Sequence, residues 1–327
     1  MSIKKTSSKK VVTITLNPAL DLTGQLTDNL SVGSVSLVSS STLHPAGKGV
    51  NVAKVLSDLG ADVTVTGFLG ADNQEAFCQL FKEINANDRF IRVSGATRIN
   101  VKLVDQASEV SDINFPGVEV DQTAIEAFEA TLDELANDHD YFVMAGSLPR
   151  GISPELCAQW IESLHQKGKK VIFDSSRQAL KAGLNSHPWL IKPNDEELSD
   201  LIGKELHSIE DYQQAAQTLE SKGIDNIVVS MGSKGVMWLN QGQWLQAKPP
   251  KMAVVSTVGA GDTLVAGLIW GHINQDLDKD NWPQQQILSF ATALSALAVT
   301  QTGVGVTDLN TVKNLQQKIR TETNSRI

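Results

Sequence analysis

The sequence contains little cysteine and no excess of positive charge. Its 327 residues include only Cys78 and Cys157, which lie far apart. Two isolated thiols exclude a disulfide framework and a thiolate metal site, and they favour a reducing, cytoplasmic compartment. Lys and Arg number 28 against 37 Asp and Glu, a net charge of -9. A general nucleic-acid surface requires clustered basic residues, so we expect no nucleic-acid partner.

Long hydrophobic runs are also absent. No stretch approaches the roughly 18 apolar residues of a membrane span, so we expect no membrane partner. Residues 1–10 should form a loose tail, because the apolar run at 11–16 is too short and interrupted for a signal peptide. The six histidines lack metal-ligand spacing. What remains, 41% hydrophobic and 20% charged residues, is the composition of an ordinary globular protein.

Short apolar runs alternate along the chain with segments of helical period. The runs are bounded by turn residues, which is typical of strands buried on both faces. They lie at residues 11–16, 63–68, 141–145, 171–173, 189–191 and 227–230. Ser153 before Pro154 predicts a helix start, Ser208 with Asp211 a capping box, and Gly60 a helix end. The pattern predicts an α/β fold in which helices sandwich a mostly parallel sheet.

Two segments, residues 21–43 and 89–120, interrupt this alternation. Both are rich in Val, Ile, Thr and Ser and lack a helical period, so they predict strands and turns. We expect them to form a small second sheet that is a lid over the site, a dimer surface, or both. The main α/β domain would then comprise residues 11–20, 44–88 and 121–315, with 316–327 as a second tail.

One carboxylate stands at the start of a helical segment, directly after two glycines. Asp262 follows Gly259-Ala260-Gly261 and precedes an apolar stretch. Small residues let the backbone approach a ligand closely, and the free N–H groups of a new helix attract anions. Asp262 could therefore accept a proton beside a bound phosphate. It could equally be an N-terminal helix cap, and residue types leave both interpretations open.

Spacing argues against two familiar glycine motifs. Gly47-Lys48-Gly49 does not complete a P-loop, because position 42 is Thr and Gly49 stands where a Ser or Thr is needed. Gly259-Ala260-Gly261 lacks the third glycine of a dinucleotide fingerprint, because position 264 is Leu. A P-loop enzyme and a Rossmann dehydrogenase are both disfavoured.

Further candidates lie at the expected ends of strands. Asp21 follows the first strand, and Lys48 stands at a helix start, where its charge and the N–H groups could hold an anion. Arg98, Asn100 and Lys102 alternate along one face of an expected lid strand. The alternatives are that Asp21 is only a turn residue, that Lys48 is a solvated lysine, and that the strand face is simply exposed to solvent.

Six short phrases together carry a family resemblance. They are residues 15–21 (TLNPALD), 47–53 (GKGVNVA), 146–149 (GSLP), 192–197 (KPNDEE), 229–235 (VSMGSKG) and 256–267 (STVGAGDTLVAG). In this order and over nearly the whole chain, they resemble the PfkB-type, ribokinase-like carbohydrate kinases. The resemblance implies a three-layer sandwich with a β-sheet lid, ATP and Mg²⁺ as cofactors, and a homodimer through the lid.

Within the family, residues 17–21, 44–49 and 97–102 are most similar to the phosphofructokinase branch. This resemblance implies ATP-dependent phosphorylation of fructose 1-phosphate at its 6-hydroxyl, giving fructose 1,6-bisphosphate. Kinases of tagatose 6-phosphate or fructose 6-phosphate are the alternatives. Ala46 stands where many members have glycine, a change that the phosphofructokinase branch tolerates.

The resemblance also implies catalytic roles. Asp262 would be the general base for the attacking hydroxyl. Gly259, Ala260 and Gly261 would present N–H groups to the charge that develops on the transferred phosphoryl group. Such catalysis consists mainly of positioning and electrostatics, so a lid that excludes water would matter.

Substrate-binding roles fall on the first third of the chain. By resemblance they belong to Asp21, Gly47, Lys48, Asn51, Arg98 and Asn100. Asp21 and Asn51 would bind sugar hydroxyls, and Gly47 would let the sugar approach the backbone. Arg98 and Lys48 would hold the existing phosphate, since a guanidinium suits bidentate phosphate contact. Arg150 is a third candidate for that phosphate.

Nucleotide-binding roles fall on the second half. By resemblance they belong to Lys192, Asn194, Ser230, Gly232, Ser233, Gly235, Gly259 and Gly261. Asn194 and Glu197 match an N-x-x-E motif that would organise Mg²⁺ through water; a helix cap and a solvated acid are the alternatives. Residues 290–298 would line the adenine pocket, although helix packing explains their small apolar side chains equally well.

Overall fold

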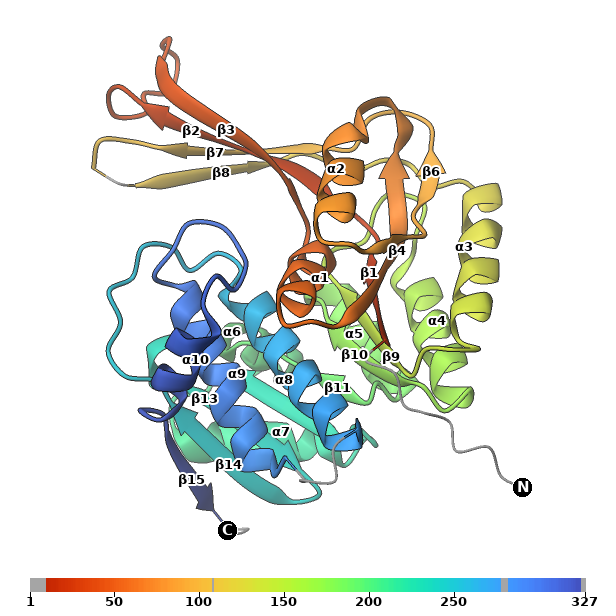
Figure 1. Cartoon of the computed structure of the whole chain (residues 1–327), viewed down its shortest axis with the longest axis vertical. Helices are drawn as coiled ribbons and strands as arrows, with labels where there is room; N and C mark the ends of the chain where they lie inside the picture. The colour runs from red at the N-terminus through yellow and green to blue at the C-terminus, as the bar shows by residue number, and fades with distance from the viewer. Residues whose placement is uncertain (1–9, 108, 278–281, 325–327) are drawn as a thin grey trace.

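The computed structural model describes residues 10–107, 109–277 and 282–324. Its centre is an 11-stranded sheet in the order β15-β14-β13-β12-β11-β10-β9-β1-β4-β5, with β6 also paired to β4 (Figure 1). The strands are β1 (Lys10–Thr15), β4 (Asp62–Gly70), β5 (Asn87–Asp88), β6 (Ile91–Val93), β9 (Tyr141–Ala145), β10 (Lys170–Asp174), β11 (Leu190–Ile191), β12 (Asn226–Ser230), β13 (Val236–Asn240), β14 (Gln243–Lys248) and β15 (Arg320–Asn324). Pairing is parallel from β5 to β12 and antiparallel from β12 to β15.

Helices cover both faces of this sheet. They are α1 (Lys48–Asp58), α2 (Glu75–Glu83), α3 (Gln122–Leu135), α4 (Pro154–Gln166), α5 (Arg177–Gly183), α6 (Asp195–Ile202), α7 (Ile209–Glu220), α8 (Ala260–Leu277), α9 (Gln284–Ala298) and α10 (Leu309–Gln316). Successive strand residues point to opposite faces. Phe142 and Met144 therefore enter a core with α3 to α7, whereas Tyr141 and Val143 enter a second core with α1, α2 and α8 to α10.

A separate four-stranded sheet projects from this body, toward the upper left in Figure 1. Its order is β3 (Val38–Ala46), β2 (Ala19–Leu26), β7 (Ile99–Val104) and β8 (Val110–Asn114). A three-layer α/β fold with a large, mostly parallel sheet and a smaller separate sheet is thus confirmed. None of the helices in the described ranges combines the length and apolarity needed to cross a membrane.

Several local predictions are confirmed. Ser153 caps α4 with Pro154 in the first turn, and Ser208 with Asp211 forms a capping box at α7. Two expectations differ from the structure. Residues 91–93 pair with β4 of the central sheet instead of the small sheet, and residues 320–324 of the expected tail pair with β14. An open sheet edge offers unpaired backbone groups that a polar strand can satisfy. The tail expected at residues 1–10 lies outside the described residues except for Lys10, which starts β1.

Candidate active site

Predicted catalytic and sugar-binding residues meet at the carboxyl ends of the parallel strands of the central sheet. α1 starts at Lys48, directly after Gly47, and α8 starts at Ala260. The Nδ2 of Asn51 in α1 donates a hydrogen bond of 2.7 Å to Oδ2 of Asp262 in α8, across 211 residues of sequence. The carboxyl ends of parallel strands, with the adjoining helix N-termini, are where open α/β sheets bind ligands.

Asp262 is a buried carboxylate near both acidic and basic groups. It is the third residue of α8, so it lies inside the first turn and is not the N-terminal cap. Burial and then the negative charge of Asp174 raise the pKa of Asp262 to about 6, against the Asn51 hydrogen bond and the charges of Lys48 and Lys192. A carboxylate with a pKa near 6 is well matched to accept a proton near neutral pH.

The turn before Asp262 requires glycine. Gly259 has a φ of 78°, in the left-handed region, and a Cβ added there would overlap Cγ2 of Val304. Gly259 also provides the carbonyl that accepts hydrogen bonds from the N–H and hydroxyl groups of Thr263, at 2.9 and 2.8 Å. The turn therefore fixes where α8 begins and where its first free N–H groups lie.

Asp174 is a site residue that sequence reasoning missed. It ends β10 with 1% of its side chain exposed, and its Oδ1 lies 3.3 Å from Nζ of Lys48 and 3.5 Å from Nζ of Lys192. Its Oδ2 is buried and has no hydrogen-bond partner within the described part of the chain. The available signal was an aspartate directly after the apolar run at 171–173, on the edge where the other strands end.

Asp174 forms salt bridges with both Lys48 and Lys192, next to the start of α8. Burial lowers the pKa of Lys48, but the charges of Asp174, Asp262 and Glu197 more than offset that effect, so the pKa lies above its usual value. Lys192 is 5% exposed, and its Nζ lies 3.4 Å from the position of a Cβ built on Gly261. Two cations therefore stand beside the N-terminus of α8, a combination suited to anionic phosphates.

The acidity of Asp262 yields a pH prediction. Protonated Asp262 cannot accept a proton, so we expect kcat to fall as the pH drops below about 6. Asp174→Asn removes a negative charge that raises this pKa, so the acid limb of the log kcat profile should move to lower pH. Steady-state kinetics from pH 5 to 8 on wild type and variant would measure the shift. An unmoved limb would contradict the assignment of that limb to Asp262.

On the sugar side, Arg98 is held by main-chain carbonyl groups. Its guanidinium donates to the carbonyl oxygens of Asn17, Pro18 and Phe115 at 3.0, 3.3 and 3.3 Å. Burial lowers the pKa of Arg98, opposed by the charge of Asp21. Within the described residues Arg98 forms no salt bridge, so its charge is available to a ligand.

The other sugar-side candidates are placed unequally. Arg98 Nη2 donates to Oγ of Ser147 at 3.5 Å, and a Cβ built on the preceding Gly146 would lie 3.9 Å from Cβ of Lys48. The segment 146–149 therefore lies next to both basic side chains. Asn100 Nδ2 donates to Asp21 Oδ1 at 3.2 Å. Arg150, in contrast, is exposed, and its main chain pairs with residues 119 and 120.

Nucleotide-side candidates also lie side by side. Asn194 forms a β-bridge with Ser230, which brings residues 192–197 next to the 3-10 turn of Gly232–Lys234. Asn194 and Glu197 form a capping box: Glu197 N donates to Asn194 Oδ1 at 2.7 Å, and Asn194 N donates to Glu197 Oε2 at 3.0 Å. Asn194 and Glu197 therefore cap α6, and a role of the two residues in binding Mg²⁺ stays a prediction. Most residues of 290–298 are buried in α9.

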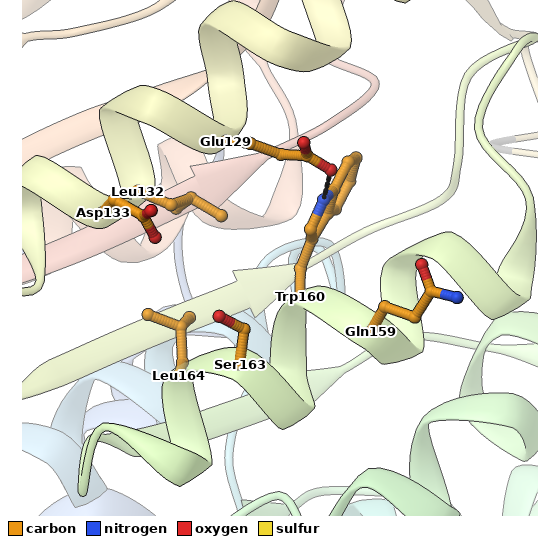
Figure 2. A pocket seen from close by; sticks show the side chains of 7 residues that line it. All are labelled: Glu129, Leu132, Asp133, Gln159, Trp160, Ser163 and Leu164. Atoms are coloured by element: carbon orange, nitrogen blue, oxygen red, sulfur yellow. Dashed lines mark hydrogen bonds between the residues drawn. The ribbon is translucent and has the colours of Figure 1, made fainter.

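A hollow of about 260 Å³ lies elsewhere, between α3 and α4 (Figure 2). Its acidic groups are already paired: Glu129 Oε1 accepts from Trp160 Nε1 at 2.9 Å, and Asp133 accepts from Lys167. No predicted site residue lines it. The hollow therefore plays no part in the site described above.

Comparisons with known proteins identify the family of the chain. Residues 14–311 match the pfkB family carbohydrate kinases. The chain is 67% identical to the 1-phosphofructokinase of Vibrio cholerae, covering 96% of each chain, and 48% identical to that of Escherichia coli, covering 92% and 94%. The structure of phosphofructokinase-2 from Escherichia coli in complex with fructose-6-phosphate superposes with a TM-score of 0.83 at 25% identity, covering 94% and 98%. The chain belongs to the pfkB family of carbohydrate kinases.

Proposed function

We propose that this kinase transfers the γ-phosphoryl group of ATP to the 6-hydroxyl of fructose 1-phosphate. The observation that carries the proposal is the buried Asp262, whose pKa is about 6, placed between Asn51 and the cations of Lys48 and Lys192. Relatives of high identity are named 1-phosphofructokinase, which supports this choice of sugar phosphate.

In the proposed reaction, Asp262 takes the proton of the 6-hydroxyl as its oxygen bonds to the γ-phosphorus of ATP. The bond from that phosphorus to the β–γ bridging oxygen breaks, and ADP leaves with the electron pair. The N–H groups at Gly259, Ala260 and Gly261 would stabilise charge on the transferred group. In phosphoryl transfer, positioning and electrostatic stabilisation supply most of the catalysis.

Sugar-phosphate recognition would come from the first third of the chain. Arg98 and Lys48 would bind the 1-phosphate, since both are cations and Arg98 has no acidic partner among the described side chains. Asn51 would bind a hydroxyl beside Asp262. Gly47 has a φ of 136°, and a Cβ there would lie 2.7 Å from Cγ2 of Thr15, so the turn before α1 requires glycine. Its backbone would contact the sugar.

A kinase of this family uses ATP, and the nucleotide side has suitable groups. Lys192 would contact the nucleotide phosphates beside Gly261. The remaining candidates lie at the end of β12 or on the adjoining turns after β11 and β12; they are Asn194, Ser230, Gly232, Ser233 and Gly235.

Mg²⁺ fits this side of the site. Across the described ranges, no group of three or more His, Cys, Asp or Glu residues could hold a metal ion on its own. Mg²⁺ in phosphoryl-transfer sites needs only one or two carboxylates besides waters and substrate phosphates. Asp174 Oδ2 is buried without a hydrogen-bond partner in the described residues, so it is a carboxylate oxygen that could face the ion. Glu197 would contact Mg²⁺ indirectly, through water. When bound, Mg²⁺ would neutralise charge on the nucleotide phosphates.

Substrate preference is the direct test. A coupled assay would compare kcat/KM for fructose 1-phosphate, fructose 6-phosphate, tagatose 1-phosphate and tagatose 6-phosphate, each with ATP and Mg²⁺. Fructose 1-phosphate should give the highest value. Equal or higher turnover of tagatose 6-phosphate or fructose 6-phosphate would overturn the substrate assignment and leave the kinase assignment intact.

A homodimer through the small sheet is part of the proposal. Strand register places Leu43, Leu22, Val101 and Ile113 in one row on one face, and Leu43 and Ile113 are each 47% exposed. Exposed apolar rows of this kind commonly mark contacts between subunits. Light scattering should give about twice the chain mass of 35.3 kDa, and a monomer would contradict the dimer.

A further inference from the structure

The small sheet carries a cluster of polar side chains on the face opposite its apolar row. β2 and β7 pair in parallel, so Asp21 lies beside Asn100 and Thr23 beside Lys102. Because side chains alternate along strands, Asp21, Asn100 and Lys102 project from the same face. Asn100 and Lys102 are therefore the direct and the diagonal neighbours of Asp21.

Both oxygens of the Asp21 carboxylate are occupied by these neighbours. Lys102 Nζ lies 2.9 Å from Oδ2, and Asn100 Nδ2 donates to Oδ1 at 3.2 Å. The side chains of Lys102 and Asp21 are each 20% exposed, so the pair is shielded from water more than an ordinary surface ion pair. Among the described side chains, Lys102 forms no salt bridge with Asp112, its direct neighbour on β8.

Asp21 poses an electrostatic difficulty for an anionic substrate. Its charge acts on Arg98, the cation proposed to bind the sugar phosphate. An unneutralised carboxylate there would repel a phosphate and compete with it for the guanidinium. In the structure, Arg98 donates to main-chain carbonyl groups and Asp21 pairs with Lys102. Arg98 and Asp21 therefore do not pair with each other, because each has a different partner.

We infer that Lys102 is a positioning residue for sugar-phosphate binding, acting through Asp21. As the counter-ion of Asp21, it leaves the positive charge of Arg98 without an acidic partner and so available to the phosphate, and together with Asn100 it orients the carboxylate toward the sugar hydroxyls. Asn100 Oδ1 is buried and without a partner in the described part of the chain, so it can accept a hydrogen bond from the same sugar. This inference rests on the proposed sugar-phosphate kinase function.

Lys102→Met removes the counter-ion and keeps much of the side-chain volume. KM for the sugar phosphate should rise by about 10- to 100-fold, as expected for losing one hydrogen bond between charged groups. The kcat and the KM for ATP should stay within about twofold of wild type, because neither the base nor the nucleotide side is touched. Lys102→Arg should recover most of the loss. Lys167→Met, which removes a cation paired with Asp133 on the remote α3–α4 surface, controls for net charge.

A double-mutant cycle with Asp21→Asn tests the route of the effect. If Lys102 acts through Asp21, the double variant binds sugar phosphate no more weakly than Asp21→Asn alone. Full additivity of the two losses would show that Lys102 contacts the phosphate directly, and it would overturn the inference. Thermal unfolding of each variant checks the fold, and Lys102→Gln replaces the Met variant if that one does not fold.

The cycle also separates this inference from the substrate assignment. It is run with whichever of the four ketohexose phosphates the wild-type enzyme turns over best. A different preferred sugar phosphate overturns the substrate assignment alone, whereas an unchanged KM in Lys102→Met overturns the role of Lys102 alone.

Discussion

Asp262→Asn should lower kcat by about 10³-fold, within the range that positioned general acid–base groups contribute. The amide oxygen can still accept the hydrogen bond from Asn51, which is 2.7 Å long in the structure, but the amide cannot take up the proton of the sugar hydroxyl. KM for the sugar phosphate should change little, because the contacts proposed for it lie on other residues. Steady-state kinetics in a coupled assay would measure both parameters.

A matched control exists on the same helix. Asp276, near the other end of α8, accepts hydrogen bonds from Tyr141 at 2.6 Å and from Lys170 at 2.8 Å, far from the sheet edge that carries the site. Asp276→Asn makes the same chemical change in the same helix and should leave kcat close to wild type. Near-normal turnover in Asp262→Asn would show that another group accepts the proton.

Gly259→Ala should be the second most damaging change, lowering kcat by about 100-fold, the cost of displacing reacting groups by about 1 Å. The new methyl group would force an L-residue into a left-handed conformation, which costs about 1–2 kcal/mol. It would also collide with Val304, so the N-terminus of α8 must move. The measurement is kcat, with circular dichroism to verify that the fold is intact.

Two further variants separate strain from collision. Gly259→Ala combined with Val304→Ala removes the collision and should recover part of the lost rate. Gly168→Ala has the same kind of strain, with a φ of 71°, but its Cβ would meet nothing within 4 Å, and it lies in the turn between α4 and β10. It should reduce stability and spare kcat. Wild-type turnover in Gly259→Ala would mean that the geometry of this turn does not limit catalysis.

Much of the fold was predictable because the signals are local. The apolar run at 141–145 coincides with β9, since a strand buried on both faces must be apolar at every position. The capping residues Ser153 and Ser208 mark helix starts because their hydroxyls accept from main-chain N–H groups three residues on. β15 escaped prediction because Arg320–Asn324 is polar and gains its structure only from pairing with the edge of β14.

The candidate site was predictable in part. Asp262 was recognisable from its glycines, but whether it capped α8 or lay inside the first turn depended on where the helix begins. Asp174 was missed because an aspartate after a short apolar run has no distinctive local pattern. Lys102 was visible as part of an alternating strand face, yet its partner Asp21 lies on a different strand, 81 residues earlier.

By itself, the sequence determined the α/β class, the family and the residue types available for phosphoryl transfer, because these depend on local periodicity and on the order of short motifs. Tertiary structure alone decided which charges meet. Packing of α1 beside α8 on one face of the sheet brings Asn51 to Asp262, and the parallel strand order brings Asp174 to Lys48 and Lys192. The pKa of Asp262 follows from that assembly, since burial and neighbouring charges come from segments distant in the chain.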